Sequence, residues 1–164
     1  MGHNISAIIL KGAFEKEKAK ELDLIDIDLG FDLTMFHIDH YYSACWQAKL
    51  KTKGNLDINN AEYMLYPSEI ALSELMVIIT KTDKPIFAII STDYFAGIGV
   101  QSANVYEKDT LVDSKIKSIN QSLKYLGVKK KLGEDEFDTV GLSKHRWTPE
   151  YLEKYYDIAD ELGV

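Results

Sequence analysis

The chain has 164 residues, of which 46% are hydrophobic and 27% are charged, a composition typical of one globular domain with its own core. A formal net charge of −7 and a single arginine, Arg146, argue against nucleic-acid binding, because an acidic surface repels phosphate groups. No apolar run reaches the length of about 20 residues that crosses a bilayer, and the single cysteine, Cys45, excludes an intrachain disulfide and favours a reducing, cytoplasmic setting.

Three strands and one short helix are predicted near the N-terminus. The apolar run 6–11 predicts a buried strand, and the charged segment 14–22 predicts a helix. In segment 24–29 apolar residues alternate with aspartates, which is typical of a half-exposed strand. Residues 33–38 predict the next strand.

Two longer helices are predicted next. Asp39 suits an N-cap because its carboxylate can accept a backbone N–H of the first turn. Residues 51–60 are polar and predict a loop, and Ser68 is expected to cap a second helix over residues 69–80. That second helix is apolar over a broad face, which implies deep burial. The apolar face of the first helix consists of Tyr42, Cys45, Trp46 and Leu50.

A β-hairpin is predicted in the middle of the chain. Residues 86–91 and 100–106 predict two strands, and between them Gly97 and Gly99 permit backbone conformations that are closed to other residues. A tight turn and a short strand over 110–112 extend the pattern. Strands joined by short turns pair antiparallel.

The C-terminal part predicts two further helices. One is capped by Asp113 or Ser114 and ends at Gly127. The other begins at residues 148–150, which read Thr-Pro-Glu and supply an N-cap, a proline and an acid. Residues 1–164 therefore predict a single α+β domain, a mainly antiparallel sheet with helices packed against it. The inner side of the last helix is expected to consist of Leu152, Tyr155, Tyr156, Ala159 and Leu162.

Residues 93–101 read Asp-Tyr-Phe-Ala-Gly-Ile-Gly-Val-Gln and resemble a segment of small uncharacterised bacterial proteins, in which an acid precedes Tyr-Phe-Gly-Gly-x-Gly-x-Gln. Residues 119–128 and 135–146 are similar to later segments of the same group, the last with an Asp-Glu-Phe-Asp-x-x-Gly-Leu-x-x-His-Arg pattern. The chain departs from the group at Ala96, where the group has glycine. The group has no known activity, so the resemblance implies positions and not a reaction. Its polar positions here are Asp93, Gln101, Asn120, Asp135, Glu136, Asp138, His145 and Arg146.

The glycine turn is the first candidate binding site. Gly97-x-Gly99 resembles the start of a dinucleotide fingerprint, but Ser102 stands at the third glycine. The following residues suit a strand and not the helix that would hold a pyrophosphate, so no cofactor is expected. The candidate residues at and beside this turn are Asp93, Tyr94, Phe95, Gly97, Gly99 and Gln101.

Histidines and acids supply two further candidates. His37, Asp39 and His40 are residue types that bind divalent metals, and His3 is a conceivable further ligand. Side chains at i and i+3 converge only on a helix, whereas this segment spans a strand end. Capping by Asp39, with the histidines at the sheet edge, is therefore the preferred interpretation, and no metal site is predicted.

The segment around the single arginine is the last candidate. His145 has the chemistry of an acid or base, and Arg146 that of a carboxylate or phosphate ligand. A salt bridge from Arg146 to Asp135 or Asp138 explains it equally well. The carboxylates of residues 134–138 fit a solvated loop, and Cys45 fits a buried, inert thiol.

These observations favour a non-enzymatic protein-binding module, of which an immunity-type protein that neutralises a toxin is one version. The acidity favours a basic protein partner, and tyrosine is enriched at protein interfaces. An unpaired edge strand or the tyrosine-bearing last helix is compatible with a homodimer. One alternative is a small enzyme with a polar cleft built from Asp93, Gln101, His145 and Arg146. The other is a metal-binding protein that uses His3, His37, Asp39 and His40.

Overall fold

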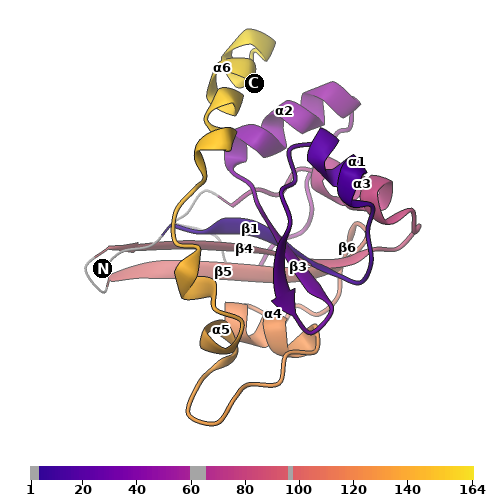
Figure 1. Cartoon of the computed structure of the whole chain (residues 1–164). Coiled ribbons are helices and arrows are strands. Elements are labelled where there is room, and N and C mark those ends of the chain that lie inside the picture. Colours follow the sequence, from indigo (N-terminus) through magenta and orange to yellow (C-terminus); the bar gives the residue numbers. More distant parts are fainter. Residues whose placement is uncertain (1–3, 60–65, 96–97) are drawn as a thin grey trace.

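The computed structural model describes residues 4–59, 66–95 and 98–164, which form one α+β domain on a six-stranded antiparallel sheet (Figure 1). The strand order is β2-β3-β1-β4-β5-β6, so the first strand lies inside the sheet. The predicted fold class is confirmed. The strands are β1 (Ser6–Lys11), β2 (Ile27–Gly30), β3 (Leu33–His37), β4 (Ile86–Phe95), β5 (Ile98–Glu107) and β6 (Thr110–Leu111).

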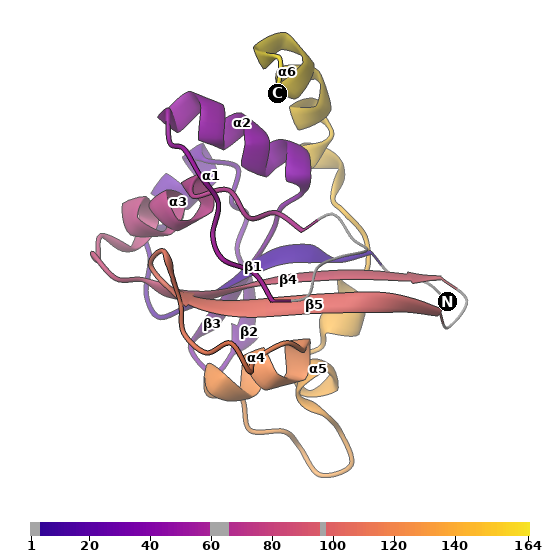
Figure 2. The ribbon, with the colours of Figure 1, turned by 180° about the vertical axis from the view of Figure 1, so that it is seen from behind.

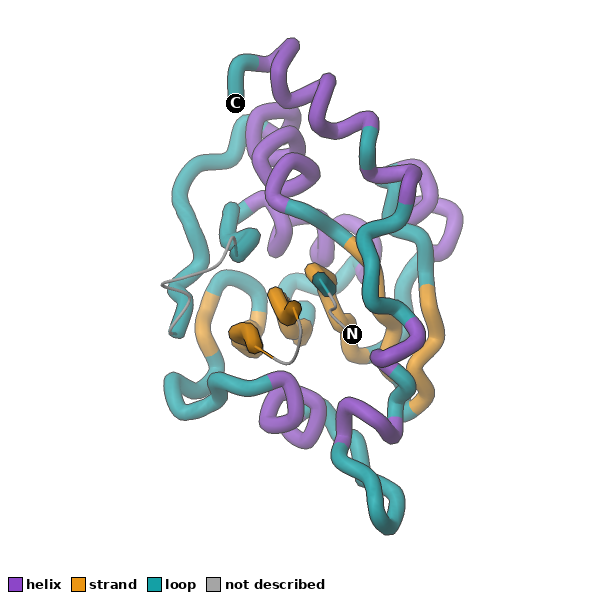
Figure 3. Tube along the Cα trace, turned by 90° about the vertical axis from the view of Figure 1, so that its left-hand side faces the viewer, coloured by secondary structure: helices purple, strands orange, loops and turns teal. Residues whose placement is uncertain are grey.

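Helices cover both faces of the sheet (Figures 1 and 2). One face packs against α1, α2, α3 and α6, and the opposite face packs against α4 and α5. Viewed along the strands, the sheet lies between these two helical layers (Figure 3). The helices are α1 (Lys16–Glu21), α2 (His40–Leu50), α3 (Ala71–Thr80), α4 (Ile119–Tyr125), α5 (Glu136–Thr139) and α6 (Lys154–Leu162), with 3-10 turns η1 (Leu142–Lys144) and η2 (Glu150–Leu152).

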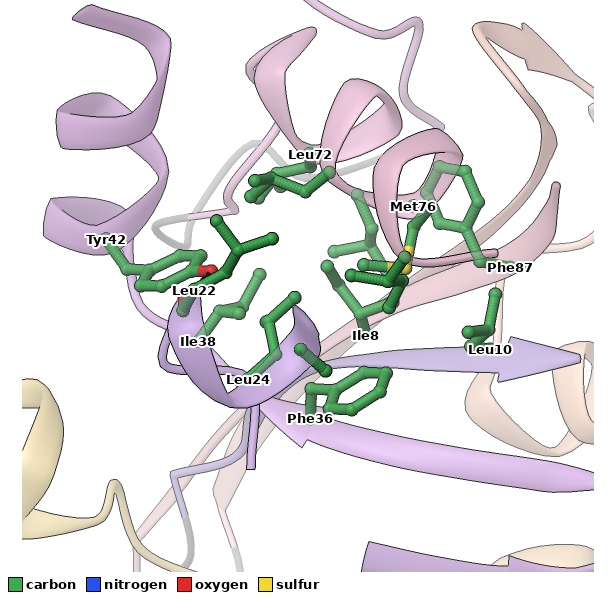
Figure 4. Close-up of a cluster of buried hydrophobic side chains, with 14 of the residues drawn as sticks. Ile8, Leu10, Leu22, Leu24, Phe36, Ile38, Tyr42, Leu72, Met76 and Phe87 are labelled. Atoms are coloured by element: carbon green, nitrogen blue, oxygen red, sulfur yellow. Dashed lines mark hydrogen bonds between the residues drawn. The ribbon is translucent and has the colours of Figure 1, made fainter. Parts of the chain in front are cut away.

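The sheet separates two hydrophobic cores. Neighbouring side chains on a strand point to opposite faces, so β1 contributes Ile8 to one core and Ile9 to the other. This double burial explains why β1 is an uninterrupted apolar run in the sequence. The core under α2 and α3 includes Ile8, Leu10, Phe36, Leu72, Met76 and Phe87 (Figure 4). The core over α4 includes Ile9, Met35, Ile90, Val105, Leu123 and Leu142.

One predicted N-cap is confirmed and three are wrong, one of them Thr148: the 3-10 turn η2 there follows Pro149, and α6 begins only at Lys154, both without a side-chain cap. The Asp39 carboxylate accepts the Tyr42 N–H at 2.7 Å and caps α2. Ser68 does not cap α3, which begins at Ala71 without a side-chain cap, because the Ser68 hydroxyl instead faces Asn55 at 3.3 Å. Helix α4 is capped by Ser118 in a reciprocal capping box, and not by Asp113 or Ser114.

The ends of two further elements differ from the prediction. Strand β2 begins only at Ile27, because the chain turns at Asp23 in a left-handed conformation (φ 58°) and buries Leu24 in the core. In the last helical segment the 3-10 turn η2 precedes α6, which breaks the helical period. Tyr156 and Leu162, which were expected on the inner side, are exposed, with 60% and 45% of their surface accessible, whereas Tyr155 and Ala159 are buried.

Tyr155 joins α6 to the rest of the domain. Its ring packs edge-on against Tyr42 of α2 at 4.9 Å between centroids. Its hydroxyl donates to the Asp23 carboxylate at 2.5 Å and accepts the indole N–H of Trp46 at 3.3 Å. The carboxylate of Asp23 also pairs with Lys154 at 2.8 Å. One side chain therefore links α6 with α2 and with the turn after α1.

Candidate functional site

The β4–β5 hairpin carries the candidate site (Figure 2). The two strands pair antiparallel from Ile86 opposite Glu107 to Phe95 opposite Ile98, which confirms the predicted hairpin. Strand β5 follows the turn directly, so the helix that a dinucleotide fingerprint requires does not occur there. Gly97 and the side chain of Phe95 lie outside the described residues.

Gly99 is required by a close backbone approach. It lies opposite Tyr94 in the hairpin. A Cβ atom built on Gly99 would come within 2.1 Å of the Asp93 carbonyl oxygen and within 2.6 Å of the Tyr94 Cα. Both atoms belong to the neighbouring backbone and cannot rotate away, so only glycine fits this position without a shift of the strands.

Substitution Gly99→Ala is expected to disrupt the end of the hairpin. Because the added methyl group collides with the β4 backbone, the free energy of unfolding should fall by about 1–3 kcal/mol, the range for overpacking. Urea unfolding measures the loss, and amide hydrogen exchange locates it. The control is Val100→Ala at the neighbouring, 37% exposed position. Equal stability and equal exchange of the two variants would contradict the close approach.

Asp93 and Gln101, which were expected to lie side by side next to the turn, are on opposite faces of the sheet. Thr92 is opposite Gln101, and Asp93 is opposite Val100. Directly opposed residues share a face and successive residues alternate. Gln101 therefore faces α4, whereas Asp93 is exposed on the other face. The prediction that Asp93 and Gln101 form one site is wrong.

A cavity of about 190 Å³ lies between the hairpin and the α4–α5 layer. It brings together three of the sequence-predicted site residues, which come from β4, β5 and α4. The carboxylate of Asp135, at the start of α5, joins them. The lining residues are Thr92, Tyr94, Gln101, Ile119, Asn120, Asp135 and Phe137.

Backbone N–H groups of α4 and α5 fix the two amide side chains that line this cavity. The Gln101 side-chain oxygen accepts from Ile119 at 2.9 Å. The Asn120 side-chain oxygen accepts from Phe137, also at 2.9 Å. Because backbone N–H groups can only donate, these bonds determine which end of each amide is oxygen. The amide nitrogens of Gln101 and Asn120 therefore point away from these backbone N–H groups.

The amide nitrogens connect the lining residues to one another. The Asn120 nitrogen donates to the Asp135 carboxylate at 3.1 Å, and the Gln101 nitrogen donates to the Tyr94 hydroxyl at 3.3 Å. Asp135 also accepts the Asp138 N–H at 2.8 Å. That backbone hydrogen bond lowers the pKa of the Asp135 carboxyl, so it is ionised at neutral pH. Its charge in turn raises the pKa of Asp138, which does not line the cavity.

Beside this cavity, part of the outer edge of β5 has no pairing strand among the described residues. Strand β6 pairs with β5 only at Tyr106 and Glu107. The Ala103 N–H donates to the Lys117 carbonyl at 3.2 Å, so odd-numbered residues of β5 turn their backbone groups outward. At Gly99 and Gln101 no strand within the described ranges pairs with these groups.

His145 and Arg146 lie on the β3 side of β1, away from the β4–β5 hairpin. The His145 ring is 6.2 Å from that of His37 in β3, and the Arg146 carbonyl accepts the Asn4 N–H at 2.8 Å. The Arg146 side chain donates to the Ser143 carbonyl at 2.8 Å. Over the described ranges it forms no ion pair with Asp135 or Asp138, and neither His145 nor Arg146 lines the cavity. The expected cleft of Asp93, Gln101, His145 and Arg146 is therefore not formed as one unit.

His37 is buried without a partner for one ring nitrogen. Its side chain faces the core over α4 and is 4% exposed, and its Nδ1 atom makes no hydrogen bond to any described residue. Burial, with a smaller effect of the neighbouring His145, lowers the pKa of His37 to about 4. His37 is therefore neutral at pH 7.

The residues considered for a metal site are dispersed. His37 is buried in the sheet, His40 stacks on Tyr41 at 4.0 Å between centroids, and Asp39 caps α2. His3 lies outside the described residues. Across residues 4–59, 66–95 and 98–164 no group of three or more histidine, cysteine or acidic side chains is arranged to hold a metal ion. The thiol of Cys45 is buried against the Tyr155 carbonyl, and burial raises its pKa.

Comparison with known proteins adds no relative: the chain matches no protein-family model, no curated protein and no solved structure. None of the helices in the described part of the chain combines the length and apolar character needed to span a membrane.

Proposed function

We propose that this protein is a binding module that recognises an extended segment of another protein by strand addition at the outer edge of β5. The observation that supports this proposal is that no strand in residues 4–59, 66–95 and 98–164 pairs with the outer edge of β5 at Gly99 and Gln101, on a hairpin whose end extends past β1. In strand addition, backbone hydrogen bonds give affinity and pockets for alternate side chains give specificity. Both components are present at one residue, since Gln101 supplies the open backbone and also lines the cavity.

The two faces of the ribbon would receive alternate side chains of the added strand. On the side facing α2, Val100 is 37% exposed and offers an apolar contact next to the exposed Asp93. On the side facing α4, the cavity accepts one side chain. A net charge of −7 favours a basic partner, because opposite charge speeds encounter. The unpaired, buried Cys45 is in keeping with a reducing compartment such as the cytoplasm.

Hydrogen exchange gives the direct test. A peptide selected from a random library with this protein as bait is expected to slow exchange at the N–H groups of Gly99 and Gln101, which face outward. The neighbouring N–H groups of Val100 and Ser102 already face β4 and serve as internal references. The expected slowing is at least about tenfold at the two outward groups.

Two substitutions separate the backbone contribution from the side-chain contribution. Gln101→Pro removes the outward N–H, whereas Gln101→Thr keeps it and removes only the amide. Strand addition predicts loss of binding in the proline variant and residual binding in the threonine variant. Slowed exchange confined to another surface, or equal binding by both variants, would exclude the β5 edge. If the same two amides are protected without peptide and light scattering gives a dimer, the occupant is a second copy of the chain.

A further inference from the structure

The cavity under Gln101 has the size of a pocket for one side chain of the bound segment. An added strand places alternate side chains on the same face as Gln101, directly over the cavity. A volume of about 190 Å³ is roughly six times the share of one water in the liquid. That volume is sufficient for one charged head group and part of its aliphatic stem.

The lining carries one permanent charge. Asp135 is ionised at neutral pH, and no lysine or arginine is among the described residues that line the cavity. Its two oxygens each accept one hydrogen bond, from Asp138 N–H and from Asn120, and a carboxylate has further acceptor sites. Over the described ranges no ion pair within 4 Å involves Asp135.

The surrounding bonds hold this carboxylate in place before a ligand arrives. Asn120 is fixed by the Phe137 N–H and holds Asp135 in turn, while Gln101 is fixed by the Ile119 N–H and holds the Tyr94 hydroxyl. A site whose groups are already oriented loses little conformational entropy on binding. Two aromatic residues, Tyr94 and Phe137, also line the cavity, and aromatic side chains attract cations.

We infer that this cavity binds a basic side chain, arginine or lysine, of the extended segment, with Asp135 as its counter-ion. This inference rests on the proposed function for the origin of the side chain, but the cavity can be tested without any partner. A cation is the ligand class that complements a fixed carboxylate in a lining without a positive group. Asn120 and Gln101 act as positioning residues that orient Asp135 and Tyr94.

The test is a titration of the ¹⁵N-labelled protein with three blocked amino acids at constant ionic strength: N-acetyl-arginine methylamide, the lysine analogue and the citrulline analogue. Citrulline has the shape of arginine without its charge. We expect saturable shifts at the side-chain NH₂ groups of Gln101 and Asn120 and at the Asp138 N–H with the cations, and binding about tenfold weaker with citrulline. The relative affinities of arginine and lysine identify which cation the cavity prefers.

The matched variants are Asp135→Asn and Asp138→Asn. Asparagine is as good an N-cap as aspartate, so Asp135→Asn keeps α5 capped while it removes the charge in the cavity and the acceptor for the Asn120 amide. It should weaken arginine binding about tenfold, while Asp138→Asn, outside the lining, should change it less than about twofold. Equal affinity for citrulline and arginine, or unchanged arginine binding by Asp135→Asn, would overturn the cation site. The proposed strand addition would not be affected by that result, because slowed exchange at Gly99 and Gln101 with a selected peptide tests the β5 edge and not the cavity.

Discussion

Acidification from pH 7 to pH 4 is expected to lower the free energy of unfolding by about 3 kcal/mol through His37 alone. The pKa of this side chain falls from 6.5 in the unfolded chain to about 4 in the folded protein. Between these values the unfolded state binds more protons than the folded state, so stability falls as the pH falls. The contribution is fully present above pH 6.5 and is lost progressively down to the folded pKa of about 4.

The physical cause is the position of the ring. His37 faces the core over α4, its Nδ1 atom has no partner among the described residues, and the ring of His145, which also disfavours a positive charge on His37, lies 6.2 Å away. A proton on His37 would place a positive charge in this core, where its Nδ1 atom has no acceptor among the residues that the structure describes. The pKa of His145 is also lowered, by partial burial and by Lys144. A histidine side chain is either neutral or positive, so His145 supplies no negative charge to compensate a protonated His37.

The measurement is urea unfolding at several pH values for the wild type and for His37→Leu. Leucine fills the apolar site and cannot be protonated, so the stability difference between the two proteins should vary by about 3 kcal/mol between pH 7 and pH 4. The carboxylates titrate equally in both proteins and cancel in the difference. His40→Leu is the control, since His40 is only half-buried at the start of α2. Parallel pH profiles for wild type and His37→Leu would show that His37 does not cause the acid sensitivity.

Substitution Tyr155→Ala is expected to lower the free energy of unfolding by about 3–5 kcal/mol, the range for removing a large buried aromatic side chain. The residue is 1% exposed and touches Tyr42, Trp46 and the turn at Asp23, so its removal leaves a cavity on the inner side of α6. Because α6 packs mainly on α2, the loss should release the C-terminal segment first. Limited proteolysis after residue 147 should therefore accelerate more than global unfolding.

Tyr155→Phe separates the hydroxyl from the ring. It removes the hydrogen bond to Asp23 and the acceptor for the Trp46 N–H but keeps the packing against Tyr42. The free energy of unfolding should therefore fall by only about 1 kcal/mol. Asp23 retains Lys154 as an ion-pair partner in this variant, which limits the loss. A phenylalanine variant as unstable as the alanine variant would mean that the hydrogen bonds, and not the packing, hold α6 in place.

The strands were predictable where the side-chain pattern was determined by burial alone. The continuous apolar run of β1 and the apolar start of β4 identified the two strands at the centre of the sheet, because both of their faces are covered. Helix starts were less predictable. Ser68, Ser114 and Ser118 all have the chemistry of an N-cap, and only Ser118 is followed three residues later by a glutamine that completes a capping box.

The candidate site was predictable in its residues and not in its arrangement. The glycine-containing segment and Asn120 were identified from the sequence, and the structure brings Tyr94, Gln101 and Asn120 together. The sequence did not determine on which face of the sheet Asp93 lies. That face depends on the length of the turn, because a shift of one residue in register exchanges the two faces of a strand. The pairing of Phe95 with Ile98 sets that register and turns Asp93 away from Gln101. Thr92 and Phe137 carried no sequence signal of a site role, since their position in the cavity depends on how α5 packs.

The position of β1 inside the sheet has a consequence for synthesis on the ribosome. Ser6 finds its neighbour Ser91 only after more than half of the polypeptide has been made. At about 5–20 residues per second, the nascent N-terminal segment waits on the order of ten seconds for β4. During that interval the apolar residues of β1 have only the β3 side to pair with, so β1 is a defined segment that chaperones can shield on the emerging chain.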